Sequence, residues 1–341
     1  MSQIEAGRFK RPTSSHDRSL GRRVHRGEYH LSGMERPPAE CHADGMKVRT
    51  GLHLTNFSFP GIAETDRLDH AVAVAVAAEE AGFDTLWVND HLIEGQPPNQ
   101  GGSRPETYIF LATVAARTSR IRLGALASSI FFRNPALLAR MVVTLDQASR
   151  GRAILGVGAG HPMTEGEHQM FGMDFPAIKL RMDRLEAVLP DLRRLLGGSI
   201  PIMVAGSGEH RLLRIVARYA DMCNLSMPSG DTLEMVRHKL DVLQAHCSSV
   251  ERGYSTITKT YKAVLSMSGP RDGDFKQGVF TGDPEQVREG AQAFIDAGID
   301  EVIVQIKTVH DLAAISQAGQ ALAGLRPRHD GTAAIAATGM A

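Results

Sequence analysis

One short stretch of the chain joins a buried strand to residues that could do chemistry. Residues 152–161 read Arg-Ala-Ile-Leu-Gly-Val-Gly-Ala-Gly-His, an apolar run that ends in Gly158, Ala159, Gly160 and His161. Glycines at a strand end let a ligand approach the backbone closely, and an imidazole can move a proton near neutral pH. The polar residues that follow could line such a site. The plainer alternative is that these glycines only form a tight turn between a strand and a helix.

A second histidine, His91, follows Asp90 at the end of another apolar run. It could donate a hydrogen bond to a developing anion, or transfer a proton. The alternative is a histidine that is bonded only to backbone groups. Other candidate residues at the ends of apolar runs are Asn56, Ser128, Ser129 and Ile130.

Gly206-Ser207-Gly208 directly precede a predicted helix over residues 209–219. The free N–H groups and the positive end of the dipole of such a helix could hold a phosphate, with Arg211 adding charge. A single Gly-x-Gly motif is a weak signal, so a purely structural turn stays an alternative.

Several other chemistries lack the residues they need. His161 and His168, with Glu165 and Glu167 nearby, do not have the spacing of a zinc-binding motif, so no metal site is predicted. The chain has no Gly-x-Ser-x-Gly motif and no plausible Ser/His/Asp order. Paired carboxylates at neighbouring strand ends, which a glycosidase uses, are not evident either.

The pattern of apolar residues predicts eight strands, each followed by a helix. The expected strands span residues 48–54, 84–90, 121–127, 153–157, 200–205, 221–226, 257–267 and 300–306. Eight alternating units favour an α/β fold of the (β/α)8 TIM-barrel type over a doubly wound open sheet. The helix expected over 177–196 contains Pro190, which should bend or break it. In a TIM barrel the strand-end residues above would meet at one face.

Composition narrows the class of protein. The 341 residues include 38 Lys+Arg and 38 Asp+Glu, so the charge balance shows no sign of a nucleic-acid partner. Three scattered cysteines do not form a disulfide framework, which favours a reducing, cytoplasmic location. No apolar run is long enough to span a bilayer. Residues 1–45 are predicted to be a disordered leader, 46–326 the barrel domain, and 327–341 a flexible tail.

Several stretches, taken together and in order, resemble a known family. They are residues 81–91, 116–124, 133–139, 145–152, 155–160 and 217–221. The region from about residue 47 to 325 is similar to the bacterial luciferase-like oxidoreductases, and most similar to the branch that uses the deazaflavin coenzyme F-420.

The resemblance implies a TIM barrel that holds a flavin or deazaflavin in its mouth, and it implies a homodimer. Asp90 and His91 match the family's Asp-His pair, whose histidine lies beside the cofactor ring. Ser129 and Ile130 match a bulge that often contains a non-prolyl cis peptide. Gly206 and Ser207 match a turn that holds cofactor phosphate.

Two departures from the family pattern bear on function. Some members that act on sugars have a glutamate where this chain has His161, and the connection over residues 197–199 is shorter than in relatives. The expected activity is hydride transfer from reduced F-420 to a small organic acceptor, with His91 and His161 as the catalytic residues. The alternatives are an FMN-dependent monooxygenase, a cofactor-binding barrel without catalysis, and a metal-dependent hydrolase, for which no ligand set is found.

Overall fold

The computed structural model describes residues 48–95, 104–206, 208–225, 232–267 and 278–328. The chain divides into two units, residues 1–35 and 36–341. The described residues all belong to the second unit, and only this unit is discussed below. The predicted leader and nearly all of the predicted tail lie outside the described residues, so these boundaries stay predictions.

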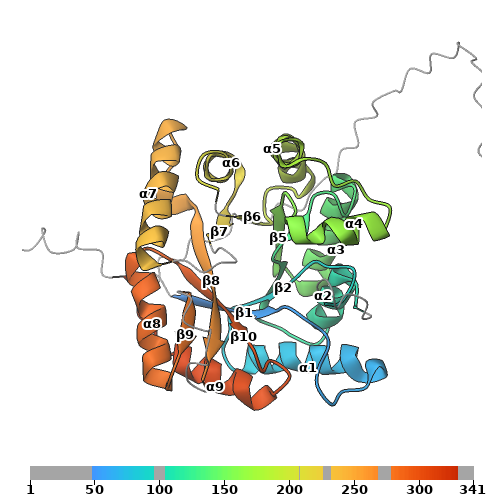
Figure 1. Cartoon of the computed structure of the whole chain (residues 1–341), viewed down its shortest axis with the longest axis vertical. Helices are drawn as coiled ribbons and strands as arrows, with labels where there is room; N and C mark the ends of the chain where they lie inside the picture. Colours follow the sequence, from blue (N-terminus) through green and yellow to red (C-terminus); the bar gives the residue numbers. More distant parts are fainter. Residues whose placement is uncertain (1–47, 96–103, 207, 226–231, 268–277, 329–341) are drawn as a thin grey trace, which may run out of the picture. The chain divides into compact units, whose positions relative to one another are not determined.

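Eight parallel strands close into a barrel, which confirms the predicted (β/α)8 fold (Figure 1). The sheet runs through neighbouring strands in the order β10-β1-β2-β3-β5-β6-β7-β8, and β10 also pairs with β8. This second pairing removes both sheet edges and excludes the open doubly wound sheet. The barrel strands are β1 Arg49–Leu54, β2 Thr85–Val88, β3 Arg122–Ala125, β5 Ala153–Gly158, β6 Ile202–Ala205, β7 Met222–Asn224, β8 Thr258–Ser266 and β10 Glu301–Ile306.

A long helix follows each barrel strand and packs outside it (Figure 1). These helices are α1 Arg67–Glu80, α2 Thr107–Ala115, α3 Pro135–Ser149, α5 Ile178–Leu195, α6 Leu212–Tyr219, α7 Leu233–Ser249, α8 Pro284–Ala297 and α9 Leu312–Leu322. Their starts follow local rules: the Asn134 side chain accepts from the N–H of Ala136, with Pro135 as the first helical residue. None of the helices in the described ranges is long and apolar enough to cross a bilayer.

Shorter elements interrupt the repeat. The two short strands are β4 Ser128–Ser129, which pairs with β5, and β9 Val279–Thr281, which pairs with β8. The short helices are η1 Glu64–Asp66, η2 Pro162–Thr164, α4 Glu165–Met170 and η3 Tyr254–Thr256. Helix α4 was not predicted, and it becomes part of the candidate site.

The expected break at Pro190 is wrong, because α5 continues through this residue. Proline cannot donate to the carbonyl one turn earlier, that of Glu186. Pro190 lies exposed, so water can satisfy that carbonyl without ending the helix.

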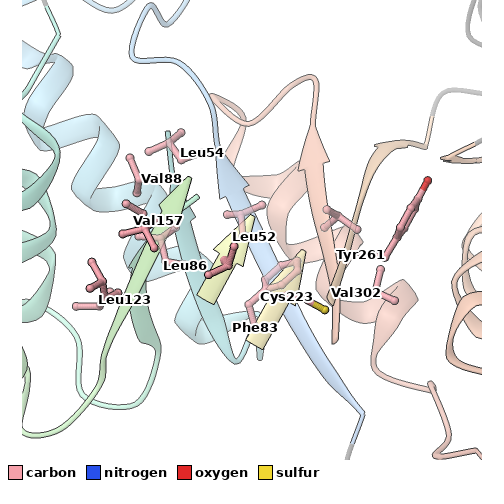
Figure 2. Close-up of a cluster of buried hydrophobic side chains, with 14 of the residues drawn as sticks. Leu52, Leu54, Phe83, Leu86, Val88, Leu123, Val157, Cys223, Tyr261 and Val302 are labelled. Atoms are coloured by element: carbon pink, nitrogen blue, oxygen red, sulfur yellow. The ribbon is translucent and has the colours of Figure 1, made fainter. Parts of the chain in front are cut away.

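Alternate residues of the barrel strands face opposite sides, and both sides are apolar. Outward residues such as Leu52, Leu86, Leu123 and Val157 form the main core between the barrel and the helices (Figure 2). A second, smaller cluster fills the barrel interior. It consists of Trp87, Leu126, Ile154, Met203, Met222 and Ile303.

The indole of Trp87 fits inside the barrel because neighbouring strands carry glycine opposite it. A Cβ on Gly124 would lie 2.6 Å from the Trp87 ring, and one on Gly51 would lie 2.9 Å from it. At Gly156 a Cβ would lie 1.9 Å from the carbonyl oxygen of Ala125, which is too close for any side chain. These glycines therefore have a packing role, unlike Gly158 at the end of β5.

Gly124→Ala is expected to lower the free energy of unfolding by about 1–3 kcal/mol, because the new methyl group overpacks the interior against Trp87. Urea unfolding followed by Trp87 fluorescence would measure the change. Gly208→Ala is the matched control, since a Cβ there makes only an ordinary contact at 3.7 Å with Leu212. Equal stability of the two variants would contradict this account of the interior.

Candidate active site

The His91 ring is held by a buried carboxylate that comes from another part of the chain. Glu167, on α4, is 1% exposed and accepts from Nδ1 of His91 at 2.8 Å. Its other oxygen accepts from the backbone N–H groups of Leu92 and Ile93. Burial would raise the pKa of the Glu167 carboxyl, but these hydrogen bonds, led by that from His91, lower it below its ordinary value.

The charge of Glu167 determines what the His91 ring can do. An ionised carboxylate only accepts, so Nδ1 of His91 carries the hydrogen and Nε2 of the neutral ring keeps a lone pair. The His91 side chain is 30% exposed, so the ring is within reach of a bound molecule. A ring held in this way can accept a proton at Nε2 and return it there.

His161 lies at the start of η2 and has the opposite arrangement. Its Nδ1 accepts from the N–H of Met163 at 3.2 Å, which leaves the hydrogen on Nε2. Burial lowers the pKa of His161, and the charges of Arg181 and His91 lower it further. His91 follows β2 and His161 follows β5, so the two predicted catalytic histidines lie at the same end of the barrel, one with an acceptor and one with a donor nitrogen.

Asp90 is 3% exposed and forms a two-pronged ion pair with Arg133. The two bonds measure 2.6 and 3.0 Å, and Arg133 also binds Glu106. Burial alone would lower the pKa of Arg133, but the carboxylates of Asp90 and Glu106 raise it. Both oxygens of Asp90 are thus engaged within the protein, and the side chain anchors the segment that carries His91.

Ser128 and Ser129 are buried and bonded within the protein. Ser128 Oγ lies 2.8 Å from the Tyr108 hydroxyl, and Ser129 Oγ lies 3.2 Å from Nε2 of His168. His168 also donates from Nδ1 to the carbonyl of Thr164 at 2.7 Å. Ile130 is 3% exposed. Because these side chains are buried and bonded to neighbouring residues, their role is to hold the ends of the strands in place.

The non-prolyl cis peptide joins Leu126 to Ala127, so its expected position at Ser129–Ile130 is wrong. Ser128 and Ser129 instead form the extended strand β4, in register with Val157 and Gly158 of β5. The irregular link lies between β3 and β4, ahead of the serines.

Two glycines, Gly158 and Gly160, lie at the end of β5 and just after it. Gly158 is the last strand residue, and a Cβ there would lie 3.5 Å from the carbonyl of Ala205, an ordinary contact. No neighbour within the described residues therefore requires glycine at this position. Gly160 differs, because it has φ +82° and its Cβ would crowd Ser129 Oγ at 3.1 Å.

Arg181 of α5 holds the next turn of backbone. Its guanidinium donates to the carbonyls of Ala159 at 3.3 Å and Gly160 at 2.6 Å, and it lies 4.0 Å from the Phe175 ring centroid. Asn56 lies exposed just after β1. Gly158 and His161 thus come from the end of β5, and Asn56 comes from the end of β1.

The predicted phosphate turn has a different geometry from the one expected. Helix α6 begins at Leu212, so a turn separates Gly206 and Gly208 from it, and Ser207 lies outside the described residues. The expectation that the glycines directly precede the helix is therefore wrong. Arg211 is bonded to Asp183 at 2.6 Å and to Glu186 at 3.1 Å, so its charge is already balanced.

No group of three or more His, Cys, Asp or Glu side chains that could hold a metal occurs in the described ranges.

Comparison with known proteins decides the family. The model of the luciferase-like monooxygenases matches residues 48–199. An F-420-dependent glucose-6-phosphate dehydrogenase 1 of Rhodococcus jostii is 30% identical over 238 residues, which cover 62% of this chain and 68% of the relative. The chain belongs to the luciferase-like monooxygenase family.

Other members of the luciferase-like family match over less of their length. The F-420-dependent glucose-6-phosphate dehydrogenase of Amycolatopsis mediterranei is 28% identical over 57% of this chain and 64% of its own. That of Kineococcus radiotolerans is 37% identical over 36% of this chain and 35% of its own. The chain thus spans less than two thirds of the length of these curated relatives.

Solved structures show the same luciferase-like barrel. An F-420-dependent secondary alcohol dehydrogenase with an F-420–acetone adduct superposes with TM-score 0.68 at 17% identity, over 82% of this chain and all of the other. The FMN-bound oxygenating constituent of 3,6-diketocamphane monooxygenase from Pseudomonas putida has TM-score 0.67 at 16% identity, over 83% of this chain and all of the other.

Sequence reasoning missed two residues of this luciferase-like site. Glu167 was considered only as a metal ligand, although it is the partner of His91. Arg133 was quoted only as part of a family stretch, although it neutralises Asp90. No local sequence signal marks Glu167 as facing inward, because the large apolar residues around α4, Met163, Met170 and Phe171, are themselves exposed.

Proposed function

We propose that this chain is an oxidoreductase that transfers hydride between coenzyme F-420 and a small organic molecule. The observation that carries the proposal is the His91–Glu167 pair at the carboxyl-terminal end of the barrel. The names of the relatives in Rhodococcus jostii and Amycolatopsis mediterranei support the choice of coenzyme.

The residues present fit a flat ring at this end of the barrel. Gly158 faces inward, as Gly156 and Ile154 do on the same strand, and leaves room where a side chain would stand. When bound, the deazaflavin would supply the hydride. The protein would orient both molecules, and Nε2 of His91 would hold or accept the substrate proton. The Nε2–H of His161 would donate a hydrogen bond from the end of β5.

Gly158→Ala tests where the coenzyme binds. The variant is expected to keep the wild-type Tm, because its Cβ meets no close contact, and to bind F-420 at least tenfold more weakly, because the methyl group occupies the room for the ring. Fluorescence titration with F-420 measures the affinity, and Asp191→Ala, at a side chain that is 69% exposed, is the control. Unchanged affinity would place the ring elsewhere, and no wild-type binding would refute the proposed coenzyme.

An FMN-dependent monooxygenase is the second candidate. The FMN-bound Pseudomonas putida structure supports it, since that protein shares the barrel. The same titration, repeated with FMN, separates the two. Preference for FMN would favour an oxygen-using reaction.

We further propose that the protein is a homodimer in the cytoplasm. Ile109 on α2 and Leu137 on α3 are 67% and 55% exposed, and these two helices pack side by side. Large apolar side chains gathered on adjoining helices are suited to contact a second copy. Light scattering should give twice the mass of one chain, and Leu137→Lys should give the mass of a single chain.

The proposed cytoplasmic location rests on the buried free thiols of Cys223 and Cys247, which suit a reducing compartment.

A further inference from the structure

Two polar side chains point into the barrel interior beside the candidate site. His53 of β1 is in register with Trp87, and Lys262 of β8 is in register with Ile303. Neighbours in register on a parallel sheet face the same side, and Trp87 and Ile303 belong to the interior cluster. His53 and Lys262 therefore face inward.

His53 is buried without the partners that a buried histidine normally has. It is 2% exposed, and neither ring nitrogen has a partner with good hydrogen-bond geometry within the described residues, although the Asn89 side chain lies close to the ring. Burial lowers the pKa of His53 well below its ordinary value, and the charge of Lys262 lowers it further. The Asn89 side chain opposes this shift, and the charges of Arg104 and His91 add to it. An unpaired buried polar group costs stability, so its presence calls for an explanation.

Lys262 has no balancing carboxylate among the described residues. Burial lowers the pKa of its ammonium group, and no acidic neighbour contributes to the shift. Three acids at this end of the barrel are engaged elsewhere: Glu94 with Arg104, Glu167 with His91, and Asp90 with Arg133. Glu301 also faces the interior, from β10, but it accepts from the Trp87 indole, and burial raises the pKa of its carboxyl.

We propose that His53 and Lys262 form a binding site for an anionic group of a ligand that enters the carboxyl-terminal end of the barrel. The ammonium group of Lys262 would form the ion pair, and the ring N–H of His53 would donate to a second oxygen. The chemical group that this site would bind carries at least two oxygen atoms that share a negative charge. Two sources can supply it: an anionic group of the substrate, or the reduced ring of the coenzyme. Only the second source rests on the proposed function.

The test follows the His53 ring by NMR in histidine-labelled protein, with the His53→Gln spectrum to assign its signal. The probes are inorganic phosphate, oxidised F-420 and reduced F-420, each titrated separately. We expect a saturable shift of the His53 signal with at least one probe. Lys262→Met should weaken that binding about tenfold to 100-fold, and Lys262→Arg should largely retain it. Lys179→Met, at a lysine whose side chain is 81% exposed, is the matched control.

The outcomes separate this proposal from the proposed function. A response to phosphate without any F-420 binding would refute the coenzyme and support a substrate anion, whereas a response to reduced F-420 alone would identify the ring as the source. If no probe moves the His53 signal, or if Lys262→Met binds as tightly as the wild type, the site does not bind anions. Lys262→Met should also raise the Tm, because it removes an unpaired buried cation. A marked fall in Tm would show instead that Lys262 supports the fold.

Discussion

His91→Ala is expected to lower kcat about 100-fold to 10,000-fold with coenzyme saturating, because it removes the group that we propose moves the substrate proton. Binding of the coenzyme should change little, since the mutation enlarges the space beside it. Steady-state kinetics together with a coenzyme titration would separate the two effects. His238→Ala is the control, at a histidine whose side chain is 61% exposed. Full turnover by His91→Ala would remove His91 from the reaction.

Glu167→Gln should reduce kcat almost as far, for a reason specific to this geometry. One oxygen of Glu167 accepts from the backbone N–H groups of Leu92 and Ile93, so the amide oxygen of the glutamine would occupy that place. Its NH2 group would then donate to Nδ1 of His91 and force the hydrogen to Nε2, where the lone pair is needed. Glu167→Asp, which keeps the charge, should retain more activity. Equal activity of the Gln and Asp variants would contradict this role.

Arg133→Met is expected to destabilise the protein by about 3–5 kcal/mol, because it leaves the carboxylate of Asp90 buried without its partner. Urea unfolding measures the change. The double variant Asp90→Leu/Arg133→Met should recover much of the loss, because no unpaired charge is then left at Asp90. Arg194→Met is the control, since that side chain is 71% exposed in a surface ion pair. If the double variant is no more stable than Arg133→Met, the pair is not the cause.

The fold could be predicted because each of its units follows local rules. Apolar runs such as 153–158 indicate buried strands, and a cap such as Asn134-Pro135 marks where a helix begins. Eight such strands, each followed by a helix, then predict a closed barrel, and a closed barrel brings His91 and His161 to the same end.

The partners of these residues could not be predicted, because they depend on contacts between distant segments. Glu167 lies 76 positions after His91, and Lys262 lies far from His53, so neither spacing has a local pattern. A sequence pattern also does not reveal shifts of a few residues in where a feature lies along the chain. The cis peptide and the first residue of α6 depend on the path of the backbone between elements, which residue types alone do not specify.

The closure of the barrel has a consequence for the growing chain. β1 lies between β2 and β10, and it is in register with β10 from Arg49 beside Glu301 to Leu52 beside Val304. During synthesis, β1 therefore has an unpaired edge until residue 306 has left the ribosome. An exposed strand edge can pair with other chains. We expect nascent chains that end before β10 to need protection by a chaperone and to remain susceptible to proteases, whereas release of the last strand closes the sheet in one step.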